Sequence, residues 1–86
     1  MKFNNIELTE ETILLTRQHF ADIMQGCIDE VLRGDVALAS HVNPKDYFDD
    51  CDKRANMYLS GKYDHTFTFL QRALWIQTGD CVALLP

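Results

Sequence analysis

The amino-acid sequence predicts a mainly α-helical fold: a small domain of three helices over residues 10–33, 44–60 and 65–78. Two patterns support this prediction. Apolar residues recur at helical spacing in all three stretches, and each stretch has a capping residue before it and a glycine near its end. A chain of 86 residues with 47% hydrophobic residues has room for one thin core. We therefore expect a single domain over residues 1–86.

The first helix, residues 10–33, has clear signals at both ends. Thr9 is a typical N-cap residue, Glu10 and Glu11 place negative charge in the first turn, and Gly34 suits a left-handed C-terminal cap. Its predicted apolar stripe comprises Ile13, Phe20, Met24, Cys27 and Val31, widened by Ile23 and Ile28.

The second helix, residues 44–60, has the strongest local start signal in the chain. Asn43 can cap it, Pro44 suits the first helical position, and Asp46 lies in the first turn. Gly61 marks its end. The apolar residues of this helix are Tyr47, Phe48, Cys51, Ala55, Tyr58 and Leu59.

The third helix, residues 65–78, is apolar around most of its circumference, which predicts a central position or an interface. Asp64 or Thr66 can cap it, and Gly79 can end it. One apolar row comprises Phe67, Leu70 and Leu74, and the other comprises Phe69, Ala73 and Ile76. The alternation of threonine and phenylalanine in HTFTFL, residues 65–70, leaves a β-strand as the competing interpretation.

The two ends of the chain contain apolar residues that the core could bury. Residues 2–8 alternate weakly, as an extended arm does, and residues 81–86 are almost entirely apolar. We expect both to pack on the core, with a short pairing of the N- and C-terminal extended segments.

Composition excludes some classes of function more firmly than it suggests others. A net charge of −5 disfavours binding to nucleic acid or to anionic membranes. No run approaches the roughly 18 apolar residues of a membrane span, and the N-terminus lacks the apolar core of a secretory signal, so we expect a cytoplasmic protein. Cys27, Cys51 and Cys81 are widely spaced, which predicts reduced thiols.

Four acidic residues crowd the second helix and raise the question of a metal site. Asp49 and Asp52 could offer two carboxylates to Mg²⁺, as a metal-dependent phosphohydrolase requires. The facing acids would be Asp22, Asp29 and Glu30, and the crowded set is Asp46, Asp49, Asp50 and Asp52. However, Asp49 with Lys53 and Asp50 with Arg54 are ion pairs at i,i+4 spacing. We therefore favour a solvated face, with no metal and no cofactor.

Other catalytic and nucleic-acid signals are weak. The three histidines share no ligand spacing, and no Gly-rich phosphate loop, nucleophile elbow or H-E-x-x-H pattern is present, which disfavours an enzyme. The second and third helices resemble a helix-turn-helix in spacing, so a nucleic-acid-binding regulator is an alternative. The third helix offers Gln71, Arg72 and Gln77 amid aromatic residues, which favours a simple helical hairpin.

The single tryptophan marks the best candidate for a binding site. Trp75 shares the one polar stripe of the third helix with Thr68, Gln71 and Arg72. Tryptophan and arginine are enriched in the hot spots of protein interfaces. These four residues are our predicted partner-binding site. The competing interpretation places Trp75 in the core.

The function that these patterns favour is a non-enzymatic protein–protein interaction module whose partner is another protein of unknown identity. Small size, acidity and the lack of a catalytic motif suit a regulatory or inhibitory accessory protein of the kind that mobile elements carry. A thin domain with an apolar third helix and an apolar tail has more hydrophobic surface than one core covers. We therefore also expect a homodimer.

Overall fold

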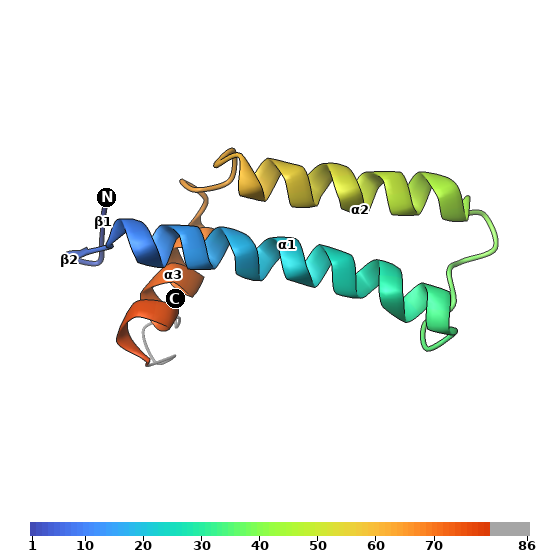
Figure 1. Cartoon of the computed structure of the whole chain (residues 1–86), viewed down its shortest axis with the longest axis horizontal. Helices are drawn as coiled ribbons and strands as arrows, with labels where there is room; N and C mark the ends of the chain where they lie inside the picture. The colour runs from blue at the N-terminus through green and yellow to red at the C-terminus, as the bar shows by residue number, and fades with distance from the viewer. Residues whose placement is uncertain (80–86) are drawn as a thin grey trace.

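A computed structural model describes residues 1–79 and confirms the mainly helical fold with three helices (Figure 1). A short hairpin of β1, Lys2–Phe3, and β2, Ile6–Glu7, precedes α1, Glu10–Arg33. The helices α2, Pro44–Leu59, and α3, Phe67–Thr78, follow. Among these helices, none is long and apolar enough to cross a membrane.

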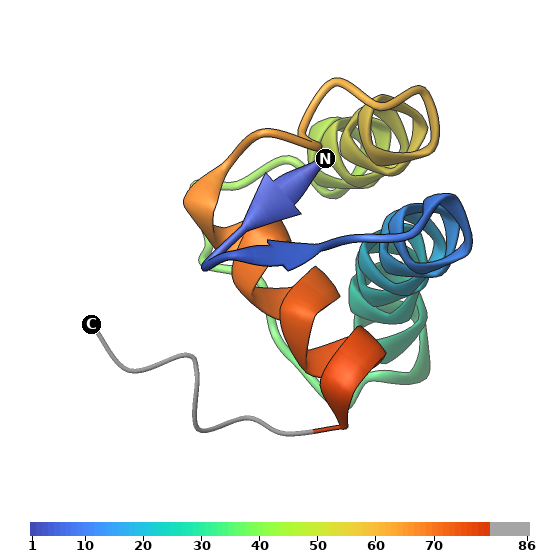
Figure 2. The same cartoon turned by 90° about the vertical axis from the view of Figure 1, so that its left-hand side faces the viewer.

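The helices form an L. Helices α1 and α2 run antiparallel as a long hairpin, and α3 crosses α1 near its N-terminal half (Figure 1). Seen along this hairpin, α3 and the β-hairpin lie on one side of the α1–α2 layer (Figure 2). The α1–α2 hairpin extends well beyond α3. We call this extension, residues 23–54, the arm.

The predicted caps of α1 and α2 are present. The Oγ1 atom of Thr9 accepts a hydrogen bond from the Thr12 amide at 3.1 Å, and Gly34 is left-handed with φ 81°. Asn43 accepts one from the Lys45 amide at 2.9 Å, and proline occupies the first turn of α2. These local signals fix the helix ends because they satisfy backbone groups that no helical hydrogen bond reaches.

Helix α3 starts two residues later than predicted. Thr66 is its N-cap and accepts a hydrogen bond from the Phe69 amide at 3.2 Å, so His65 lies outside the helix. Asp64 does not cap α3 because its carboxylate binds Arg17 of α1. The strand interpretation of residues 65–70 is wrong, since residues 67–70 are helical.

The core lies where α1, α2 and α3 meet. Phe20 stacks on Tyr58 of α2 with ring centroids 4.8 Å apart and packs against Phe69 of α3 at 6.0 Å. The buried apolar cluster comprises Leu8, Ile13, Phe20, Phe69, Ala73 and Leu74. Ile23, predicted in the buried stripe, is 40% exposed because it lies at the edge of that stripe, one residue before Met24, which faces the α3 side.

The N-terminal residues 2–7 pair with one another as a β-hairpin. Strands β1 and β2 are antiparallel around Asn4 and Asn5, which both have positive φ, as a tight type I′ hairpin turn requires. Gln77 of α3 holds this hairpin to the body: its side-chain amide donates to the Glu7 carbonyl at 2.8 Å and accepts from the Thr9 amide at 2.9 Å. The predicted C-terminal pairing partner, residues 81–86, lies outside the described residues.

An ion pair fastens the α2–α3 loop to α1. The Nε atom of Arg17 donates to both carboxylate oxygens of Asp64, at 3.1 and 3.0 Å, and its Nη2 atom contacts Oδ2. This hydrogen bonding raises the pKa of Arg17, and the Asp64 side chain is only 6% exposed. Gly61 has φ +86°, and a Cβ atom there would lie 3.0 Å from the Arg17 Nη2 atom. Only glycine suits that position, because it allows both the left-handed turn and the close approach.

We predict that Asp64→Ala lowers the free energy of unfolding by about 2–3 kcal/mol, because it leaves the partly buried Arg17 guanidinium without its partner. Urea unfolding measures this loss. The matched control is Asp35→Ala, whose ion pair with Arg33 at 3.0 Å is about 60% exposed on both sides and is worth less than about 1 kcal/mol. Equal losses in the two variants would contradict the anchoring role of Asp64.

Candidate partner-binding surface

The structure places the predicted site on one flank of α3. Trp75 is half-buried, and the guanidinium carbon of Arg72 lies 4.1 Å from the centroid of its ring. Gln71 is also half-buried, and Thr68 is exposed. The indole is therefore neither fully buried nor free in solvent, and one of its faces carries a cation–π contact.

A hollow of about 450 Å³ opens beside this side of α3, where all three helices meet. It is lined by Met24, Arg54, Tyr58, Tyr63, Thr66 and Thr68. Arg72 and Trp75 follow Thr68 by one and two helical turns, so they continue the same flank of α3. We call these eight residues the corner, since they lie in the angle between α3 and the arm.

Aromatic contacts shape the corner. The rings of Tyr58 and Tyr63 are 4.5 Å apart, and the Tyr63 hydroxyl donates to the Met57 sulfur at 3.1 Å. Burial raises the pKa of Tyr58, so its hydroxyl stays protonated at neutral pH and can donate a hydrogen bond. The corner thus offers apolar ring surface together with a few polar groups, a combination that favours binding of another surface.

Sequence analysis predicted only the α3 part of the corner. Met24 and Tyr58 were assigned to core-facing stripes, and Tyr63 and Arg54 had no predicted role in binding. No local pattern could have found them, because they come from α1, α2 and the α2–α3 loop. Only the crossing of α3 over α1 brings the four side chains beside Thr68.

His19 of α1 lies near the Arg72 side of the corner and is half-buried. Its Nε2 atom is buried and has no hydrogen-bond partner within residues 1–79. Burial lowers the pKa of His19, the positive charge of Arg72 lowers it further, and Asp22 acts in the opposite direction. The fold therefore favours the neutral imidazole.

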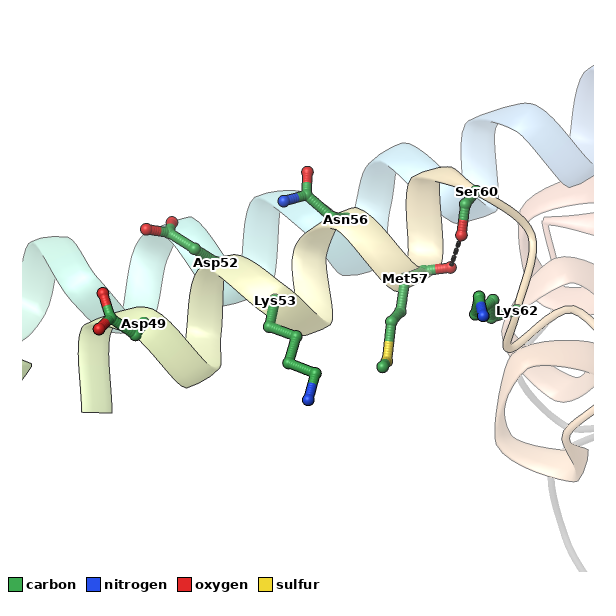
Figure 3. A pocket seen from close by; sticks show the side chains of 7 residues that line it. All are labelled: Asp49, Asp52, Lys53, Asn56, Met57, Ser60 and Lys62. Carbon is green, nitrogen blue, oxygen red and sulfur yellow. Dashed lines mark hydrogen bonds between the residues drawn. The ribbon is translucent and has the colours of Figure 1, made fainter. Parts of the chain in front are cut away.

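Two further hollows lie outside the corner. The outer face of α2 carries a shallow hollow of about 550 Å³ lined by Asp49, Asp52, Lys53, Asn56, Met57, Ser60 and Lys62 (Figure 3). Apart from Lys62, these residues belong to α2 and its cap, so no second element faces them. A groove of about 440 Å³ between α1 and α2, which we call the acidic groove, includes Asp22 and Asp52 in its lining.

Two of the four acidic residues of α2 form surface ion pairs. Asp50 pairs with Arg54 at 3.1 Å, as predicted. Asp49 pairs with Lys45 at 3.0 Å and not with Lys53, because helical side chains lean toward the N-terminus and carry Asp49 toward Lys45. Within residues 1–79, no group of three or more His, Cys, Asp or Glu side chains could hold a metal ion.

Comparison with known protein families, curated proteins and solved structures finds no match for this chain. The function of this chain is therefore inferred from the geometry and chemistry of the corner.

We predict that the protein loses stability as the pH falls below about 6.5, the ordinary pKa of histidine, because protonation of His19 is disfavoured in the folded state. This contribution of His19 to the free energy of unfolding is fully present above the pKa that His19 has in the unfolded chain. It is lost as the pH falls from there through the lower pKa of the folded protein. Urea unfolding from about pH 7.5 to about pH 5 measures it. His19→Gln should flatten the dependence, and His65→Gln, at an exposed position, should not. Equal slopes for wild type and His19→Gln would contradict this assignment.

Proposed function

We propose that this protein is a non-enzymatic interaction module that binds another protein through the corner. The observation that carries the proposal is the half-buried Trp75 under the Arg72 guanidinium, next to a hollow lined by two tyrosines and a methionine. Tryptophan, tyrosine and arginine dominate the energetics of protein interfaces, and methionine is enriched in them.

The arrangement of these side chains supports the proposal further. Trp75 needs little reordering to bind, because Arg72 already covers one face of the indole. Tyr58 is held by its stacking on Phe20, and Tyr63 by its hydrogen bond to Met57. A surface whose large side chains are fixed before binding loses less conformational entropy when a partner arrives.

The alternatives have less support. A hydrolase needs a nucleophile or metal with a positioned base, and two of the four acids of α2, Asp49 and Asp50, are engaged with neighbouring cations. A nucleic-acid-binding regulator needs a concentrated basic surface. The corner contributes Arg54 and Arg72, but Arg54 is paired with Asp50 and the chain has a net charge of −5.

We predict that Trp75→Ala weakens partner binding by about 2 kcal/mol or more, roughly thirtyfold in Kd, while the melting temperature stays within a few degrees. Tagged protein is immobilised, and the retained host proteins and untagged copies of the chain are quantified by mass spectrometry. The main retained protein is then titrated against each variant. Arg72→Ala should weaken binding in the same direction with little change in stability.

Leu14→Ala is the control for this experiment. Leu14 is 53% exposed in α1, lies before the arm and does not line the corner, so its truncation should leave both retention and melting temperature unchanged. Two results would count against the corner: unchanged retention by Trp75→Ala and Arg72→Ala, or a loss of about 3–5 kcal/mol in the stability of Trp75→Ala, as truncation of a core residue produces.

A further inference from the structure

We infer that the partner of the corner is a second copy of this chain, docked so that the acidic arm of each copy lies in the corner of the other. This inference rests on the proposed function and names its partner. It follows from three features of the chain: the segregation of charge along its length, the partly covered apolar row of the arm, and the L shape of the molecule.

Charge is divided between the end of the arm and the segment that builds most of the corner. Residues 28–50 carry six acidic and two basic side chains, whereas residues 51–79 carry four basic and two acidic ones. Arg54 and Arg72 place two of these basic groups in the corner itself, and because Arg54 is already paired with Asp50 of its own chain, Arg72 supplies most of the attraction. The end of one arm and the corner of another copy are therefore electrostatically complementary, which favours pairing of unlike ends.

The arm also has an apolar row on α1 that α2 covers only in part, with Cys27 beside Tyr47 of α2. Ile28 and Cys51 are buried between α1 and α2, but Met24, Cys27 and Val31 are only half-buried. These three residues recur at spacings of three and four on α1, and Met24 opens into the corner. The row thus continues the corner along the arm, on the side of the layer where α3 lies.

The L shape allows both contacts at once. The part of α1 within the arm, residues 23–33, spans about 16 Å, and the twelve residues of α3 span about 18 Å. When two arms lie face to face and antiparallel, each arm ends against the α3 helix of the other copy. A two-fold axis relates the copies, so both corners are filled and the contact closes as a dimer.

A charge-swap experiment on the full chain tests this arrangement. The corner variant carries Arg54→Glu and Arg72→Glu, and the arm variant carries Glu30→Lys and Asp46→Lys. The control variant, Asp22→Lys with Asp52→Lys, makes the same charge change as the arm variant but in the acidic groove. Although Asp52 belongs to the arm, the groove opens on the other side of the α1–α2 layer, because Asp22 and Gln25 lie on the face of α1 opposite to Met24. Sedimentation velocity at low salt measures association, and circular dichroism confirms that each variant is folded.

We expect the wild type and the control variant to be dimers at tens of micromolar. The corner and arm variants should each dimerise at least about tenfold more weakly alone and should recover the dimer when mixed in equal amounts. A monomeric wild type, an arm variant that dimerises like the wild type, or a mixture without recovery would overturn the inference. A different host protein retained in a Trp75-dependent manner would overturn it too, while sustaining the proposed function.

Discussion

The ion pair between Arg17 and Asp64 is the constraint on which the rest of the structure depends. It joins α1 to the α2–α3 loop across 47 residues of sequence and is largely shielded from water on the Asp64 side. Because Gly61 leaves room for the guanidinium, the chain turns sharply there and α3 is directed across α1. Without this anchor, α3 would be positioned only by its core contacts through Phe69, Ala73 and Leu74 and by the hydrogen bonds of Gln77.

The crossing of α3 explains both the thin core and the position of the proposed binding surface. Where α3 covers α1, aromatic residues of three helices fill a common core. Where α3 ends, the arm continues as two helices that bury little more than Ile28 and Cys51 between them. The corner is the boundary between these regions, and for that reason its larger apolar side chains, Met24, Tyr58, Tyr63 and Trp75, are half-buried. Chemistry suited to an interface therefore arises directly from the geometry of the fold.

The sequence predicted the three helices and their caps because those signals are local, as Thr9, Asn43 and Gly34 illustrate. It did not predict the ion pair, since Arg17 and Asp64 each had a local interpretation, as a polar helix residue and as a cap. Helical periodicity also could not show how wide the covered stripe of α1 is, so it predicts Ile23 as buried although that side chain is 40% exposed. Only the α3 part of the corner was predicted, because the rest depends on tertiary arrangement.

The single tryptophan provides the most direct test of the central claim, that the corner is a protein-binding surface occupied by a second copy. The indole N–H of Trp75 gives one isolated signal in a proton–nitrogen NMR spectrum of labelled protein. On dilution, this signal and the amides of Tyr58, Tyr63 and Thr68 should shift together as the copies separate, while those of Asp22 and Asp52 stay fixed. Signals that do not move, or shifts centred on the acidic groove, would contradict the account.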